Sequence, residues 1–295
     1  MEPANGYGRF TMIRAFSNLI MLPEDSKVFC ADTESGYQFY SGGFFGYGEK
    51  GDFVPYSLMH FIPILVIVLL IVLCFLKKDR LRSWKYEGRF RFICAFVMLI
   101  AEMSYFWRLV YVGDETGAGS MLLKLPLQVC QWGLICAFFA LLSLNDTLFG
   151  INFFISLCLT TPALFIPTVI SRTGPGYYRY YQFWLEHGLP IINVFYLMTV
   201  HRKKPKYRHL WLAVGLLLLM SIPCLIANRT IPNANYMYLG NFAPGSTNTL
   251  DPLSSFPKEQ YPRFFLMVGL AVVLFHIAFF VWKGIDQLYQ KKHSK

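Results

Sequence analysis

The chain has 295 residues, of which 55% are hydrophobic, 18% are aromatic and only 15% are charged. An average soluble domain carries about 25% charged residues, so this composition excludes an ordinary soluble protein and favours one that lies within a membrane. The net charge of +10 would by itself suggest nucleic-acid binding. The basic residues gather beside apolar stretches, however, which argues against a nucleic-acid partner and for a topology signal.

Residues 1–56 form a segment rich in Gly, Tyr and Phe, with too little aliphatic content to build its own core. Within it, the stretch RFTMIRAFSNLIML lacks the basic start and the small-residue cleavage site of a signal peptide. We interpret it as a short amphipathic helix that lies on the membrane surface. The whole segment is expected outside the membrane, where it would cap the outer mouth of the protein.

Seven apolar stretches long enough to cross a bilayer follow, because about 20 apolar residues span the hydrocarbon core. The fourth is interrupted by Pro162 and Pro167, and the fifth is diluted by Glu186 and His187. The predicted fold class is therefore all-α: a polytopic membrane protein with a seven-helix transmembrane bundle over residues 57–285. The predicted spans are 57–76, 90–112, 124–143, 147–170, 178–200, 207–227 and 262–283.

Three segments carry most of the basic residues: 77–91, 201–209 and the tail at 286–295. All three fall on one side of the membrane if the chain crosses seven times. Basic loops stay in the cytoplasm, so we expect the C-terminus to be cytoplasmic and the N-terminus to lie outside. We expect a multi-pass integral membrane protein in the plasma membrane of a bacterium.

The loop at 228–261 is the longest between spans, and its sequence NANYMYLGNFAPGS mixes Asn, aromatic and Gly residues. Loops of this length without secondary structure are usually functional or disordered, and the interleaved aromatics favour an ordered lid. Asn233, Asn235 and Tyr236 are the residues expected to cover the site or bind substrate. The triplet NRT at 228–230 is also an N-glycosylation sequon on the outer side.

Four ionisable or nucleophilic residues share one layer in the outer half of the predicted bundle. A helix rises about 1.5 Å per residue, which places Cys130 of the third span, His187 of the fifth, and Glu102 and Arg108 of the second at comparable depths. Charged residues at such depths normally face the interior of a bundle and pair with one another. We therefore expect Glu102 or Glu186 to pair with Arg108 or to orient His187.

Cys130 differs from the other six cysteines because Gln128 and Gln131 flank it. A thiolate nucleophile with a histidine base is a known solution for acyl transfer. Gln128, Gln131 or Arg108 could donate hydrogen bonds to a developing oxyanion. These parts require no cofactor, and the cysteines show no CxxC and no metal-ligand spacing, so no metal site is expected.

The same polar residues permit a different function, which is transport of a small polar solute. In a transporter or channel, Glu102, Arg108, Glu186 and His187 would form a proton or substrate relay along a cavity. A seven-helix receptor shares the predicted topology. The chain nevertheless lacks the acidic-Arg-aromatic triplet that usually follows the third span of such receptors.

Several segments together resemble the YwaF family of integral membrane proteins, in order and spacing over most of residues 58–285. A vertebrate relative of that family is a transmembrane acyltransferase that remodels ether phospholipids. The segments that carry the resemblance are LPLQVC at 125–130, YYQFWLEHGLPIINVFYL at 180–197, ANRTIPNANYMYL at 227–239, and the Pro/Tyr approach to the last span at 256–262.

The resemblance implies a phospholipid acyltransferase whose catalytic pair is a cysteine in the third span and a histidine in the fifth. On matching positions these residues are Cys130 and His187. The implied substrates are a phospholipid and a lysophospholipid, and no cofactor is implied. The chain departs from the family at two positions: bacterial relatives usually carry histidine in place of Gln128, and the vertebrate enzyme carries histidine in place of Gln131.

Overall fold

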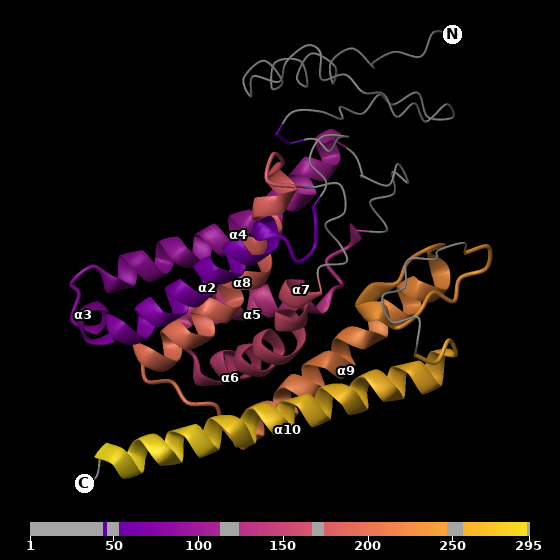
Figure 1. Ribbon diagram of the computed structural model, residues 1–295. Helices are drawn as coiled ribbons and strands as arrows, with labels where there is room; N and C mark the ends of the chain where they lie inside the picture. The colour runs from indigo at the N-terminus through magenta and orange to yellow at the C-terminus, as the bar shows by residue number, and fades with distance from the viewer. Residues whose placement is uncertain (1–43, 46–52, 113–123, 167–173, 247–255, 294–295) are drawn as a thin grey trace.

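The computed structural model describes residues 44–45, 53–112, 124–166, 174–246 and 256–293. Within these ranges every regular element is helical (Figure 1). The amphipathic helix and nearly all of the segment predicted at 1–56 lie outside the described residues. The elements are α2 (Leu58–Leu76), α3 (Lys78–Arg82), α4 (Glu87–Val112), α5 (Val129–Ser143), α6 (Asp146–Ile155), the π-helix η3 (Ser156–Thr160), α7 (Thr161–Phe165), α8 (Tyr178–Thr199), α9 (Tyr207–Thr230), the 3-10 helix η4 (Tyr236–Tyr238) and α10 (Gln260–His293).

Each of the seven predicted spans contains a helix, and the fourth is built from α6, η3 and α7 in succession. Five helical segments are long and apolar enough to cross a membrane, as expected of a helical membrane protein. They are Leu58–Leu76, Glu87–Arg108, Asp146–Phe165, Tyr207–Thr230 and Gln260–Lys292. The two remaining helices, α5 and α8, depart from that pattern for different physical reasons.

Helix α5 begins at Val129 rather than at residue 124, and its 15 residues are fewer than a straight span needs. Pro126 keeps a helix from running through residue 125, because proline disfavours helical backbone in the residue before it, and the N–H of Leu127 donates instead to the carbonyl oxygen of Leu125 at 2.7 Å. Gln128 is the extended N-cap, with φ −85° and ψ 149°. As a result, Cys130 is the second residue of α5 and not a residue well inside a longer helix.

Helix α8 is less apolar than the others because it lies inside the bundle, in contact with α2, α4, α5, α6 and α7. Its polar residues Arg179, Gln182, Glu186, His187 and Asn193 are all buried. A helix enclosed by other helices can carry polar residues if they find partners, whereas a lipid-facing helix cannot. The low hydropathy of this span therefore reflects a polar interior.

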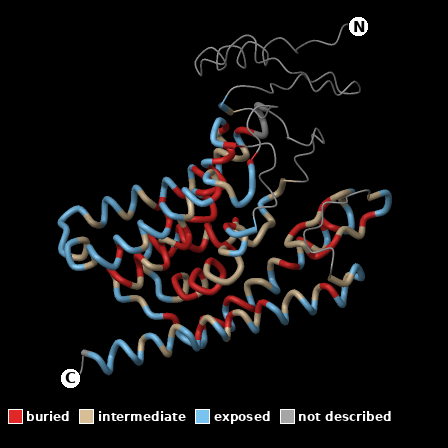
Figure 2. The backbone as a smooth tube through the Cα atoms, viewed as in Figure 1, coloured by how far each residue is buried: buried red, intermediate tan, exposed pale blue. Residues whose placement is uncertain are grey.

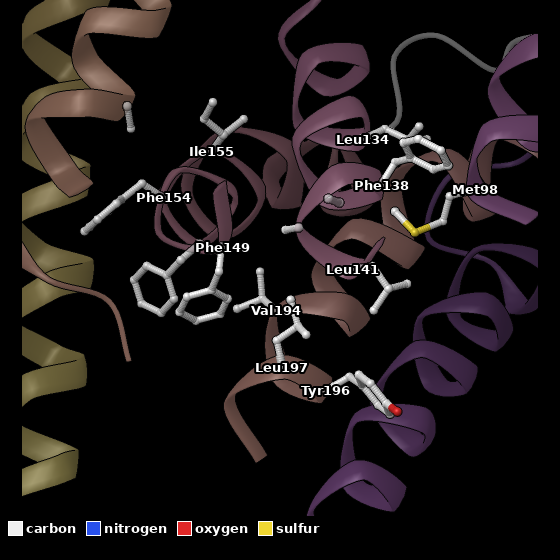
Figure 3. Close-up of a cluster of buried hydrophobic side chains, with 14 of the residues drawn as sticks. Met98, Leu134, Phe138, Leu141, Phe149, Phe154, Ile155, Val194, Tyr196 and Leu197 are labelled. Carbon is white, nitrogen blue, oxygen red and sulfur yellow. The ribbon is translucent and has the colours of Figure 1, made fainter. Parts of the chain in front are cut away.

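The main hydrophobic core lies where α4, α5, α6 and α8 meet, and Figure 3 shows side chains from all four helices pointing into it. Buried residues line the inner faces of these helices, whereas long stretches of α2 and α10 are exposed (Figure 2). The exposed residues there are mostly large and apolar, such as Leu65 and Phe280. Extensive exposed apolar surface of this kind is typical of contact with lipid.

The three basic segments lie at one end of the bundle, where Figure 1 also shows the C-terminus. Arg82 donates hydrogen bonds to the carbonyl oxygens of Thr199 and Val200 at the end of α8. Lys204 forms an ion pair with Asp286 of α10 at 2.8 Å. The seven predicted spans require this shared end, because an even number of crossings separates each basic segment from the next. Helix α10 continues to His293 through most of the predicted tail, and the assignment of this end to the cytoplasm stays a prediction.

The sequon at 228–230 is not available for glycosylation in this fold. Asn228 is fully buried; its Oδ1 accepts a hydrogen bond from the N–H of Tyr236 at 2.7 Å, and its Nδ2 donates to the carbonyl oxygen of Tyr236 at 3.1 Å. Because a glycan is bulky and needs a surface asparagine, we expect a glycosidase to leave the gel mobility of the chain from eukaryotic cells unchanged. A shift that disappears in Asn228→Gln would contradict this placement.

Candidate functional site

A cavity of about 310 Å³ lies toward the end of the bundle that carries the outer loop. Its wall combines the start of α5 and the N-terminal half of α8 with parts of α9, α10 and the loop that contains η4. The predicted site residues that line it come from three separate parts of the chain. They are Gln128, Cys130, Gln131, Glu186, His187 and Tyr236.

Cys130 faces two of these residues across the interface between α5 and α8. Its thiol donates a hydrogen bond to Oε1 of Glu186, with an Sγ–Oε1 distance of 3.6 Å. One ligating atom from each of Cys130, Glu186 and His187 lies within 4.8 Å of the other two. The structure thus brings together the sulfur and the imidazole that the sequence placed at similar depths.

The position of Cys130 in the first turn of α5 affects its chemistry. The first N–H groups of a helix have no partner within the helix, and the helix dipole is positive at this end. Both effects favour an oxyanion that forms beside the sulfur, and they oppose the effect of the nearby Glu186 carboxylate on a thiolate at Cys130. A helix that began at residue 124 would have placed Cys130 nearly two turns inside, where the dipole acts only weakly.

The tautomer of the His187 ring follows from its hydrogen bond to the backbone. Nδ1 lies 2.8 Å from the carbonyl oxygen of Phe183. A carbonyl oxygen can only accept a hydrogen bond, so Nδ1 carries the proton and Nε2 of the neutral ring carries the lone pair. The ring is buried, and Nε2 is its basic atom.

Glu186 is held in place by two side chains from its own helix. Its Oε2 accepts hydrogen bonds from Nη1 of Arg179 at 3.2 Å and from Nε2 of Gln182 at 3.0 Å, and Arg179 also donates to Gln182. The Arg179 guanidinium lies 4.5 Å from the ring centre of Tyr105, within range of a cation–π interaction. Arg179, and not Arg108, supplies the guanidinium to Glu186.

Sequence reasoning missed Arg179 and Gln182, although a signal was present. Arg179, Gln182 and Glu186 are spaced at i, i+3 and i+7, so they share one face of a helix. Arg179 lies between Tyr178 and Tyr180 near the start of α8, and aromatic residues at the end of a span are typical of the membrane interface. The spacing of these three residues identifies the polar face of α8, whereas the mean hydropathy of the segment does not.

The two glutamines that flank Cys130 fix the start of α5 to its surroundings. Gln131 donates through Nε2 to Oε1 of Glu102 at 2.8 Å and accepts through Oε1 from the N–H of Gln128 at 3.1 Å. Gln128 accepts through Oε1 from the N–H of Met237 at 3.0 Å. Glu102 is buried behind the cavity and contacts the site through Gln131.

The remaining predicted residues lie farther from the cysteine. Arg108 donates through Nε to the carbonyl oxygen of Phe45 at 2.7 Å and does not line the cavity. Asn233 and Asn235 also lie outside its wall. Asn235 accepts a hydrogen bond from the N–H of Gly240 at 2.9 Å, so it shapes the loop itself.

Tyr236 is the predicted loop residue that does line the cavity, and it is 2% exposed. Its hydroxyl accepts a hydrogen bond from the N–H of Leu125 at 2.9 Å, which ties the outer loop to the segment before α5. Burial raises the pKa of Tyr236 to about 12. The phenol therefore stays protonated near neutral pH and does not act as a general base there.

A model of the TMEM164 family matches residues 55–282. No curated protein and no solved structure matches the chain. The matched range begins just before α2 and ends within α10, so it includes every helix that lines the cavity. The chain therefore belongs to the TMEM164 family of transmembrane proteins.

Proposed function

We propose that this protein is a membrane-embedded, cysteine-dependent acyltransferase that acts on phospholipids in the outer half of the bilayer. The observation that carries the proposal is the cluster of Cys130, Glu186 and His187, in which the sulfur, a carboxylate oxygen and a ring nitrogen lie within 4.8 Å of one another beside a cavity. The resemblance of the segments around Cys130 and His187 to a transmembrane acyltransferase supports the same chemistry.

The cavity combines the two environments that a lipid substrate needs. Its apolar wall includes Leu217 of α9 and Met267, Val268 and Ala271 of α10, which suits an acyl chain. Polar side chains stand around Cys130 at the start of α5, where an ester group would lie. Lys124 also lines the cavity and provides a cation for a lipid phosphate.

In the proposed reaction, the Cys130 thiol gives its proton to Nε2 of His187, and the sulfur attacks the carbonyl carbon of the acyl ester. The ester C–O bond breaks, and the departing lysolipid oxygen takes the proton from the imidazolium, which leaves an acyl-thioester on Cys130. The hydroxyl of an acceptor lysolipid then gives its proton to His187 and attacks the thioester. The released sulfur takes that proton back. Glu186 stabilises the imidazolium in both steps.

The proposal is tested by trapping the acyl-thioester with a phospholipid that carries an alkyne at the end of its acyl chain. The full chain in liposomes is expected to become labelled, and hydroxylamine should remove the label because thioesters are sensitive to it. Cys130→Ala should remove all labelling, because the nucleophile is gone. His187→Gln should slow labelling by about 10²–10⁴-fold, the usual contribution of a general base.

The matched control is Cys136→Ala, since Cys136 lies on the same helix and is buried but does not line the cavity. The Cys136→Ala variant should be labelled to the same extent as the unchanged chain. Persistent labelling of a folded Cys130→Ala variant would remove Cys130 from the role of nucleophile. A folded, unchanged chain that no phospholipid donor labels would overturn the proposal as a whole.

A further inference from the structure

The cysteine, carboxylate and imidazole at the site are also a set of metal ligands. We propose that Cys130, Glu186 and His187 form a reversible binding site for Zn²⁺, and that a bound ion blocks acyl transfer. The blocking effect rests on the proposed function, whereas the binding site does not. The expectation that no metal binds came from sequence spacing, which does not register ligands that come from two helices.

The distance between the Cys130 sulfur and the Glu186 carboxylate fits the coordination geometry of zinc. Zinc lies about 2.3 Å from a thiolate sulfur and about 2.0–2.2 Å from a carboxylate oxygen. In a tetrahedral site these bond lengths place the sulfur and the oxygen about 3.5 Å apart. The observed distance from Sγ of Cys130 to Oε1 of Glu186 is 3.6 Å. An ion between them needs little movement of either side chain.

The neighbours of the ligands are those that metal sites use. A ligating histidine normally donates its second ring N–H to a carbonyl or carboxylate, and a ligating carboxylate is itself hydrogen-bonded. His187 donates through Nδ1 to the carbonyl oxygen of Phe183, which leaves Nε2 as the ligand. Oε2 of Glu186 is held by Arg179 and Gln182, which leaves Oε1 as the ligand.

The ligand types select the ion. One sulfur, one nitrogen and one oxygen suit a borderline-soft cation such as Zn²⁺, whereas Mg²⁺ and Ca²⁺ prefer oxygen ligands alone. Three protein ligands leave a fourth position for water, and the adjoining cavity provides the space for it. The thiolate and the carboxylate together balance the charge of a divalent ion.

Metal binding and acyl transfer compete for the same atoms. The ion replaces the proton of the Cys130 thiol, which is released to solvent, and it occupies the lone pair on Nε2 of His187. While zinc is bound, the sulfur of Cys130 cannot attack the acyl carbonyl, and the imidazole of His187 cannot accept a proton. Zinc added before the acyl donor should therefore prevent labelling, and a chelator should restore it.

Binding is measured with Co²⁺, which takes zinc sites and absorbs light when it binds thiolate. The full chain is purified in detergent through a tag that contains neither histidine nor cysteine. A thiolate-to-cobalt charge-transfer band should saturate at one ion per chain, and Zn²⁺ should bleach it. The band should be absent in Cys130→Ala and intact in the control variant Cys136→Ala.

His187→Gln should keep the band but weaken Co²⁺ binding by more than about 100-fold. Loss of an outer-shell partner alone costs about 10–100-fold in affinity, and loss of a direct ligand should cost more. If Cys130→Ala does not fold, X-ray absorption of the unchanged chain with Zn²⁺ should show one sulfur at about 2.3 Å among lighter ligands. A shell without sulfur, or no band in the unchanged chain, overturns the metal site. If the metal-free chain is not labelled by the acyl donor but binds Co²⁺ when the ion is added, the acyltransferase proposal is wrong and the metal site still holds.

Discussion

Replacing Arg179 by methionine is expected to lower the free energy of unfolding by about 3–5 kcal/mol, the usual effect of breaking a buried ion pair. The side chains of Arg179 and Glu186 are each 7% exposed, and their charged atoms lie 3.2 Å apart. Methionine fills most of the volume of the arginine stem but leaves the Glu186 carboxylate without its cation. Thermal unfolding in detergent, followed by tryptophan fluorescence, measures the change.

A double-mutant cycle separates the loss of pairing from the loss of packing. In a Glu186→Gln background the carboxylate is already neutral, so Arg179→Met should cost much less there than in the unchanged chain. The matched control is Arg229→Met, since Arg229 is exposed in the last turn of α9 and should change stability little. Equal losses in both backgrounds would show that the two residues are not coupled.

The same pair explains why the site could be predicted from the sequence only in part. Depth along a helix follows from residue number, so the convergence of Cys130 and His187 was accessible. Which side chains touch depends also on the rotation of each helix about its axis, and hydropathy does not fix that rotation. The sequence therefore predicted that Cys130 and His187 lie in one layer, but it placed Arg108 there instead of Arg179 and did not predict the contacts Glu186–Arg179 and Glu102–Gln131.

The fold shows a similar limit at the start of α5. Leu125 and Leu127 continue the apolar stretch on both sides of Pro126, so a hydropathy window extends the span back to 124. The chain instead turns at Pro126, where the N–H of Leu127 donates to the carbonyl oxygen of Leu125 at 2.7 Å, and Gln128 is extended, because proline disfavours helical backbone in the residue before it. Composition predicted the membrane class and the helical segments. The residue at which α5 begins, which decides the environment of Cys130, follows only from the backbone conformation in the structure.

Replacing Gly150 by alanine is expected to destabilise the bundle by at least the upper end of the about 1–3 kcal/mol that overpacking costs. A Cβ atom at this position would lie 1.9 Å from Nδ1, 2.2 Å from Cγ and 2.5 Å from Cβ of His209. His209 is fully buried, and a rotation of its ring does not move its Cβ. Helix α9 would have to move away from α6, and thermal unfolding in detergent would report the loss.

Two further variants identify the clash as the cause. His209→Gly should recover more stability in the Gly150→Ala background than His209→Ala does, because only glycine removes the Cβ contact. Gly215→Ala is the matched control, since a Cβ there meets nothing within 4 Å; it should raise stability by about 0.5–1 kcal/mol through helix propensity. A Gly150→Ala variant with unchanged stability would contradict the close contact.

Because Leu217 and Ser221 of α9 line the cavity, a displaced α9 should also slow acyl labelling of Cys130, although Gly150 does not line the cavity.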